Sequence, residues 1–137
     1  MSGALQAVFQ NQRSFGPPPG QAQYTTAGTY SWVAPAGITS VSAVCIAGGA
    51  GGVQYPSGTY AMSGGTGGGL GWKNNITVVP ASSYTVVVGV GGGLAQYSAT
   101  GGTGGTSYFV SAGTVAGNGG LGGKYSTERA SGGTYVG

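Results

Sequence analysis

Glycine is the feature that most restricts how this chain can fold, because 33 of its 137 residues are glycine and most of them stand in tracts. Glycine loses the most backbone entropy on folding and has no side chain to pack, so a glycine tract makes a weak strand or helix. There are only six prolines and no strict Gly-X-Y repeat, which excludes a collagen triple helix. The tracts cover residues 48–52, 64–71, 89–93, 101–105 and 117–123.

The apolar runs between the tracts indicate a folded domain and not a disordered chain. Hydrophobic residues make up 39% of the sequence and charged residues 4%, whereas disordered chains are usually highly charged and poor in apolar residues. The apolar residues are strand formers such as Val, Ile, Tyr and Trp, and they are gathered in runs. The length of 137 residues suits a single domain.

These runs predict an all-β fold. Strands are expected at residues 41–47 (VSAVCIA), 76–79 (ITVV) and 84–90 (YTVVVGV), with shorter pieces at 24–33, at 108–110 and around Val115. Residues 80–83 (PASS) predict a hairpin-like connection between two of the strands. No helical period of useful length follows residue 20, and strands at this spacing favour a β-sandwich or jelly roll over a parallel α/β sheet.

The glycine tracts could adopt either of two structures. They could form flexible loops, or they could pack side by side as extended helices of the polyglycine-II type, with three residues per turn. In the second structure, glycine at recurring positions lets neighbouring backbones approach and exchange hydrogen bonds. We expect the packed form, because five tracts of similar length suit a cooperative bundle.

Residues 1–20 differ from the glycine-rich β domain expected over residues 21–137. They are rich in Gln and Asn, and the prolines at 17–19 enforce an extended segment that could act as a stiff spacer. A frayed tail is one interpretation. We favour an N-terminal docking arm that orders on a partner. Its anchors would be apolar, with one arginine as a polar clamp: Leu5, Val8, Phe9, Phe15 and Arg13.

The residues needed for most enzyme chemistry are missing from the sequence. It contains no His and no Asp, and Glu128 is its only carboxylate side chain. Paired-carboxylate, Ser-His-Asp and Cys-His sites therefore cannot form within one chain. His- and carboxylate-based metal sites are excluded in the same way, and no complete glycine-rich nucleotide motif is present. We expect no catalytic, metal-binding or cofactor-binding residues.

Charge is equally scarce, with four cationic side chains and a net charge of +3. The cations form no patch, so we expect no binding of nucleic acid. A surface with so little charge is poorly protected against association, which favours a homo-oligomer. The longest apolar run, residues 41–47, is too short to insert across a membrane. Its single cysteine, Cys45, is expected to be a buried small apolar residue and not a reactive thiol.

The order of these elements resembles a known family. A turn at residues 33–37 (VAPAG) precedes a strand and glycine tract at 41–52, a second strand and tract at 84–93, and a further polyglycine segment at 101–109. This order resembles the glycine-rich domain of many tailed-phage tail-fibre and virion proteins, and it is also similar to the glycine-rich domain of the anaplastic lymphoma kinase ectodomain. The resemblance implies a jelly-roll-like β-sandwich with inserted polyglycine-II-type glycine helices, preceded by an extended N-terminal arm.

The phage proteins are the closer match, because the receptor domain belongs with disulfide-bearing secreted modules and this chain has one cysteine. The match implies a virion structural protein, a tail-fibre or receptor-binding component that is assembled in the host cytoplasm. Its arm would dock on other virion proteins, and its loops would contact a host-surface receptor. The loops at 53–63 and 94–100 carry Tyr, Ser and Gly, as recognition loops do. The candidate contacts are Tyr55, Tyr60 and Tyr97, with ordinary solvated loops as the alternative.

Two further functions stay open. The first is a purely structural virion protein, such as an adaptor, a decoration protein or a fibre base, that makes no host contact. The second is an ice- or polysaccharide-binding polyglycine protein that uses flat rows of Thr and Ser. The irregular spacing of the threonines disfavours such rows; they stand at Thr59, Thr66, Thr103 and Thr106.

Overall fold

The computed structural model describes residues 20–54, 63–96, 100–124 and 132–137, and every regular element among them is a β-strand. In these ranges no helix is long and apolar enough to cross a membrane. The strands are β1 (Gly28–Val33), β2 (Ser40–Ile46), β3 (Val53–Gln54), β4 (Leu70–Thr77), β5 (Ser83–Val88), β6 (Ala95–Gln96), β7 (Ser107–Phe109), β8 (Val115–Gly117) and β9 (Tyr135–Val136). Except for Gly20, the predicted N-terminal arm lies outside the described residues.

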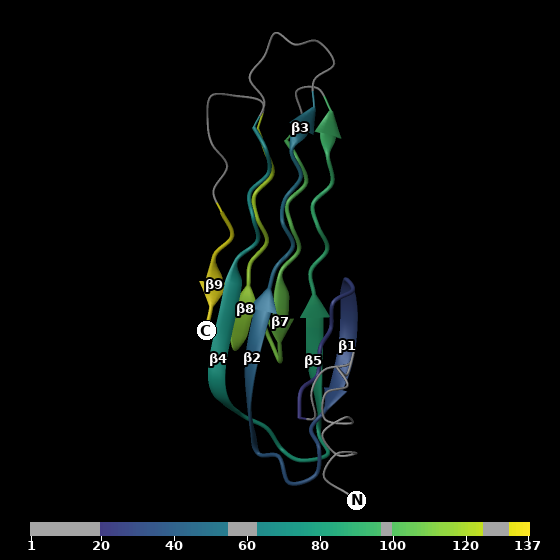
Figure 1. Cartoon of the computed structure of the whole chain (residues 1–137), viewed down its shortest axis with the longest axis vertical. Helices are drawn as coiled ribbons and strands as arrows, with labels where there is room; N and C mark the ends of the chain where they lie inside the picture. The colour runs from purple at the N-terminus through teal and green to yellow at the C-terminus, as the bar shows by residue number, and fades with distance from the viewer. Residues whose placement is uncertain (1–19, 55–62, 97–99, 125–131) are drawn as a thin grey trace, which may run out of the picture.

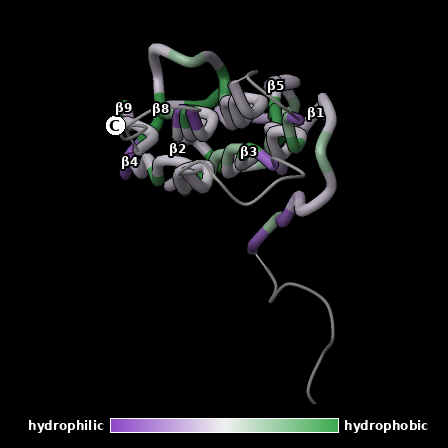
Figure 2. The backbone as a smooth tube through the Cα atoms, turned by 90° about the horizontal axis from the view of Figure 1, so that it is seen from above, coloured by the Kyte–Doolittle hydropathy of each residue, from purple (hydrophilic) through white to green (hydrophobic). Residues whose placement is uncertain are grey.

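The strands form two main layers, which confirms the predicted all-β, sandwich-like fold. One layer is an antiparallel sheet in the order β1-β5-β7-β8-β9, and the other is the antiparallel pair β2-β4. The β2-β4 pair lies against β7 and β8 of the larger sheet. Seen along the long axis, the backbone forms two rows, with β8 and β5 in one and β4 and β2 in the other (Figure 2). A short parallel pair, β3-β6, lies farther along the same axis (Figure 1).

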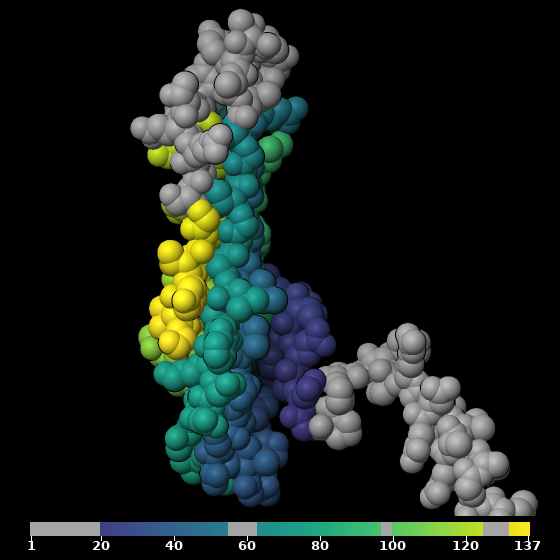
Figure 3. Space-filling model, turned by 60° about the vertical axis from the view of Figure 1, so that its left-hand side comes forward, coloured from purple at the N-terminus to yellow at the C-terminus, as the bar shows by residue number. Residues whose placement is uncertain are grey.

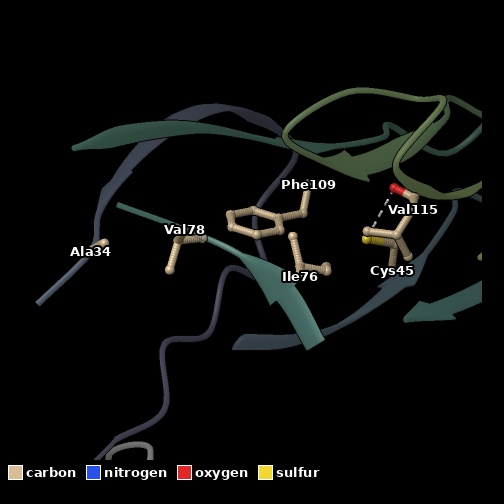
Figure 4. Packing of buried hydrophobic residues seen from close by; sticks show 6 residues of the cluster. All are labelled: Ala34, Cys45, Ile76, Val78, Phe109 and Val115. Carbon is tan, nitrogen blue, oxygen red and sulfur yellow. Dashed lines mark hydrogen bonds between the residues drawn. The ribbon is translucent and has the colours of Figure 1, made fainter. Parts of the chain in front are cut away.

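The apolar core fills the space between the two layers. Alternation along the strands points every second side chain inward, and the buried cluster comprises Ala34, Cys45, Ile76, Val78, Phe109 and Val115 (Figure 4). As expected, Cys45 is buried, and its thiol contacts the carbonyl oxygen of Val115 at 3.8 Å. Burial raises the pKa of the Cys45 thiol, because the thiolate would lose its hydration. The protonated, unreactive form is thereby favoured.

The predicted hairpin across residues 80–83 is wrong. β4 pairs with β2 and β5 pairs with β1, so the strands on either side of this connection lie in different layers. Val78, which is 2% exposed, donates its N–H to the carbonyl oxygen of Thr39 at 3.0 Å. Pro80 has no N–H with which to continue the β4 ladder. The pairing of β4 thus ends near Val78 and Pro80, and the chain then crosses from the β2-β4 layer to the five-stranded sheet.

The glycine tracts continue the strands along the long axis and are joined to one another by backbone hydrogen bonds (Figure 1). The N–H of Gly48 donates to Gly105 at 3.0 Å. Three residues later, the N–H of Gly51 donates to Gly102 at 2.9 Å. The other backbone hydrogen bonds of this tract also come in pairs whose members lie three residues apart along each tract. Written from the N–H donor to the carbonyl acceptor, these pairs are Gly92 to Gly49 with Ala95 to Gly52, Gly120 to Gly48 with Gly123 to Gly51, and Ala47 to Gly69 with Ala50 to Thr66.

A repeat of three residues is the repeat of a polyglycine-II helix; the assignment of that helix type to each tract stays a prediction. The close approach itself requires glycine. A Cβ placed on Gly104 would lie well under 3.0 Å from the carbonyl oxygen of Gly48. A Cβ on Gly119 would overlap the carbonyl oxygen of Gly104, and one on Gly122 would overlap that of Gly101. The obstacle in each case is backbone, which cannot rotate away as a side chain could.

We expect Gly104→Ala to lower the free energy of unfolding by about 3 kcal/mol or more, because the added methyl group must push two hydrogen-bonded tracts apart. Gly67→Ala is the matched control, since a Cβ at Gly67 meets nothing within 4 Å. The control should stay within about 1 kcal/mol of the unchanged chain. Urea unfolding measures both variants, and equal stabilities would contradict close packing of the tracts.

Candidate recognition surface at the end of the glycine bundle

All eight residues predicted from the sequence to dock or recognise a partner lie outside the described residues. These are Leu5, Val8, Phe9, Arg13 and Phe15 of the arm, and Tyr55, Tyr60 and Tyr97 of the loops. The structure does place the residues that flank the loops. The candidate surface is therefore built from those flanking residues, here called the bundle end.

The parallel pair β3-β6 brings the starts of both loops together. Val53 is in register with Ala95, and Gln54 is in register with Gln96. Tyr55 and Tyr97 follow directly after the two paired glutamines in the sequence. Because parallel strands in register end at the same level, Gln54 and Gln96, the described residues from which the two loops continue, lie side by side.

The other attachment points lie at the same end. Val53 donates its N–H to the carbonyl oxygen of Ser63 at 3.4 Å, so the first and last residues of the loop at 53–63 lie side by side. Ser63 also holds Lys124, after which the segment 125–131 begins. The Ser63 hydroxyl donates to the Lys124 carbonyl oxygen at 2.9 Å and accepts from the Lys124 N–H at 2.6 Å.

A second hydroxyl group makes the same pair of hydrogen bonds three residues farther along the two tracts. We call each such pair of bonds a hydroxyl clamp. Thr66 stands three residues after Ser63, and Leu121 three residues before Lys124. The Thr66 hydroxyl accepts from the Leu121 N–H at 2.9 Å and donates to its carbonyl oxygen at 3.2 Å. Ser63 and Thr66 were not predicted from the sequence. Their spacing of three was the available signal, because it places both hydroxyl groups on one side of a three-residue turn.

The segments attached at the bundle end have a shared composition. Residues 55–62, 97–99 and 125–131 each begin with tyrosine and each contain serine, so Tyr125 extends the set of three tyrosines predicted from the sequence. Such segments offer aromatic rings, hydroxyl groups and backbone groups for binding. Among the described residues, no group of three or more His, Cys, Asp or Glu is placed to hold a metal ion.

A family model for the glycine-rich domain matches residues 25–137, which include both the sandwich and the glycine bundle. This chain belongs to the glycine-rich domain family. The family description names neither an assembly nor an activity, so it supports the resemblance only as far as the glycine-rich domain itself. A search of curated proteins finds no match to the chain.

We expect Ser63→Ala to loosen the bundle end, because the substitution removes both hydrogen bonds to Lys124 at once. The cost should be about 1–2 kcal/mol of local stability, measured as faster hydrogen exchange of the Lys124 amide. Ser63→Thr, which keeps the hydroxyl group, is the matched control. An unchanged exchange rate in the alanine variant would show that the clamp does not hold the two tracts together.

Proposed function

We propose that this chain is a structural component of a tailed-phage particle, a tail-fibre or receptor-binding protein that contributes to host attachment. The observation that carries the proposal is where the tyrosine-containing segments attach relative to the N-terminal side of the described chain. Three tyrosine-containing segments attach at or near the bundle end, whereas residues 20–27 lie beside β1 in the sandwich half (Figure 1). The Tyr30 hydroxyl of β1 donates to the Thr26 carbonyl oxygen at 2.8 Å.

This arrangement suits a protein that is anchored at one end and makes contact at the other. The arm would dock on other virion proteins through its apolar residues Leu5, Val8, Phe9 and Phe15, with Arg13 pairing to a polar group. The glycine bundle would act as a spacer between the particle and its target. Its tracts are cross-linked by backbone hydrogen bonds at about 2.7–3.4 Å, which resist sliding of one tract along another.

The proposed contact is one of binding and not of catalysis. The sequence provides no His, no Asp and a single Glu, whereas tyrosine and serine are suited to recognising polar surfaces. Tyr55, Tyr60 and Tyr97 would supply the contacts to a host-surface receptor. The low charge favours a homo-oligomer, whose mass can be measured by light scattering. The protein would be assembled in the host cytoplasm and would act on the extracellular virion.

Antibody labelling of intact particles in the electron microscope tests this proposal. An antibody against residues 53–63 should label the tips of tail fibres. A second antibody, raised against the sandwich connection at residues 34–39, should label closer to the particle than the first. The order of the two labels thus reports the direction in which the protein projects.

Label confined to the head or the collar would contradict a role in host attachment and would favour the purely structural alternative. Absence of the chain from purified particles, judged by mass spectrometry, would overturn both. A mutant phage that lacks the chain but adsorbs to its host at the normal rate would also exclude the attachment role.

A further inference from the structure

The outer face of the β2-β4 layer is an exposed apolar surface. Side chains alternate between the two faces of a strand, so this face carries Val44 and Ile46 of β2 together with Leu70 and Trp72 of β4. Val44 is paired directly with Trp72, and Ile46 with Leu70. The four side chains therefore form one patch, here called the apolar patch. Their exposed fractions, in the order of the sequence, are 66%, 64%, 49% and 56%.

The other outer face of the sandwich carries mostly hydroxyl groups. On the five-stranded sheet, Thr29 and Ser31 of β1 and Ser83 and Thr85 of β5 are exposed, and Ser31 is paired with Thr85. Val33 is the one large apolar side chain that is exposed on these two strands. Polar side chains suit a sheet face that stays in water. The apolar patch has none, which indicates that another molecule covers it.

The face of the patch carries neither of the two lysines in the described chain. Lys73 follows Trp72 in the regular part of the β2-β4 ladder, so its side chain leaves β4 on the other face. Lys124 lies at the end of the segment that continues β8. Two copies of this face can therefore meet without the cost of like charges opposite each other.

β9 marks the lateral limit of the patch. It lies along β4 (Figure 3), and the two strands border a groove of about 340 Å³. The groove is lined by Trp72, Lys73, Asn74, Tyr135 and Gly137.

Along the other direction, the patch continues as bare backbone. Figure 3 shows β4 and the tract before it as one continuous teal column. In steps of three residues from the last patch residue of each strand, every position is glycine. These glycines, here called the glycine strip, are Gly49 and Gly52 in line with β2, and Gly64 and Gly67 in line with β4. A Cβ placed on any of them would lie 3.6 Å or more from every other tract.

The single chain does not require glycine at the four positions of the strip. None of them has a φ angle in the left-handed region, so alanine would fit there and would reduce the freedom of the unfolded chain. Glycine instead leaves the backbone open to close approach from outside. Inside the bundle, the tracts that pack against one another are bare in the same way.

The strip also has unused hydrogen-bonding groups. Among the described residues, the N–H groups of Gly49 and Gly67 donate to no other residue, and both glycines are exposed. The carbonyl oxygens of Gly65 and Gly68, in the same tract as Gly67, accept from none. The layer thus offers both donors and acceptors, spaced by the three residues that relate the bonds within the bundle.

We propose that this face, the apolar patch together with the glycine strip, pairs with the same face of a second copy of the chain. A two-fold contact requires a self-complementary surface, and this one carries donors, acceptors and apolar side chains but no charge. Parallel alignment of the two long axes brings patch onto patch and strip onto strip. The contact gives the homo-oligomer expected from the low charge its interface, and it does not depend on the virion role.

The size of the face predicts a moderate affinity. It consists of residues 44–52 and 64–72, which is slightly fewer than the roughly 20–30 residues a side of a stable interface. Trp72 is its only aromatic anchor. We expect a dissociation constant on the order of 10 μM. In the parallel dimer both bundle ends lie at one end, so the segments attached there would be presented in two copies.

Sedimentation velocity of the full chain between about 1 and 200 μM tests the proposal. The mass should rise from 13.1 kDa to twice that value. Trp72 and Trp32 are the only tryptophans, and Trp32 is already half-buried. Burial of Trp72 in the dimer should therefore shift the tryptophan emission to shorter wavelength over the same concentration range.

Variants assign the contact to this face. Leu70→Glu should weaken dimerisation at least about tenfold, because it places two like charges in an apolar interface. Leu121→Glu is the matched control: Leu121 is 47% exposed and Leu70 is 49% exposed, but Leu121 lies on the tract that continues β8 in the other layer. Gly49→Ala should also weaken dimerisation about tenfold, although the single chain has room for the methyl group. Thermal melting of the dilute variants confirms that each is folded.

A chain that stays monomeric over the whole concentration range would overturn the proposal, as would equal weakening by Leu70→Glu and Leu121→Glu. Unchanged affinity of the Gly49→Ala variant would overturn the contact through the glycine strip. These outcomes are distinct from failure of the proposed function. Dimers of a chain that is absent from phage particles would exclude the virion role and keep the interface. Label at fibre tips from a chain that is monomeric in solution would exclude the interface and keep the virion role.

Discussion

The structure depends on how closely the backbones of the glycine tracts approach one another. The tract at residues 48–52 and its flanking residues exchange hydrogen bonds with four other tracts, those near residues 66, 92, 102 and 120. At many of these contacts the backbone leaves no room for a Cβ, as at Gly48, Gly51 and Gly104, whereas Gly49 and Gly52 have ordinary van der Waals space. The packing that side chains provide in an ordinary core is here provided by main-chain atoms, so glycine is a structural requirement and not a sign of flexibility.

The bundle and the sandwich support each other because they share the same chain segments. β2 leads into the tract at residues 48–52, and the tract at residues 101–105 leads into β7. The strand pairs therefore also fix the hydrogen-bond register of the glycine tracts that continue from them. The apolar core is small, and it consists largely of alanine, valine and single larger residues. Hydrogen bonds between tracts add order over a length that this core does not reach.

The part of the chain that the structure describes offers few charged groups for binding. The described residues carry only two charged side chains, Lys73 and Lys124. The large apolar side chains that are exposed in this part of the chain are mostly aliphatic, and Trp72 and Tyr135 are the aromatic ones among them. Further aromatic rings are expected at the bundle end, where the tyrosine-bearing segments attach. Aromatic rings and hydroxyl groups suit targets for which shape and stacking matter more than electrostatic attraction.

The sequence by itself determined local features of this protein, namely the strands near residues 41–47, 84–90 and 108–110 and the burial of Cys45. Each depends on alternation or composition within a few residues. The sequence misplaced β4, which begins at Leu70 within the predicted tract 64–71 and ends at Thr77, whereas a strand was expected at 76–79. Only the tertiary structure decided the pairings that join distant segments. It separated β4 from β5, paired β3 with β6 in parallel, and set Tyr135 beside Trp72. Two-residue strands and a groove between distant strands leave no periodic pattern in the sequence, because their partners are chosen by how the whole chain packs.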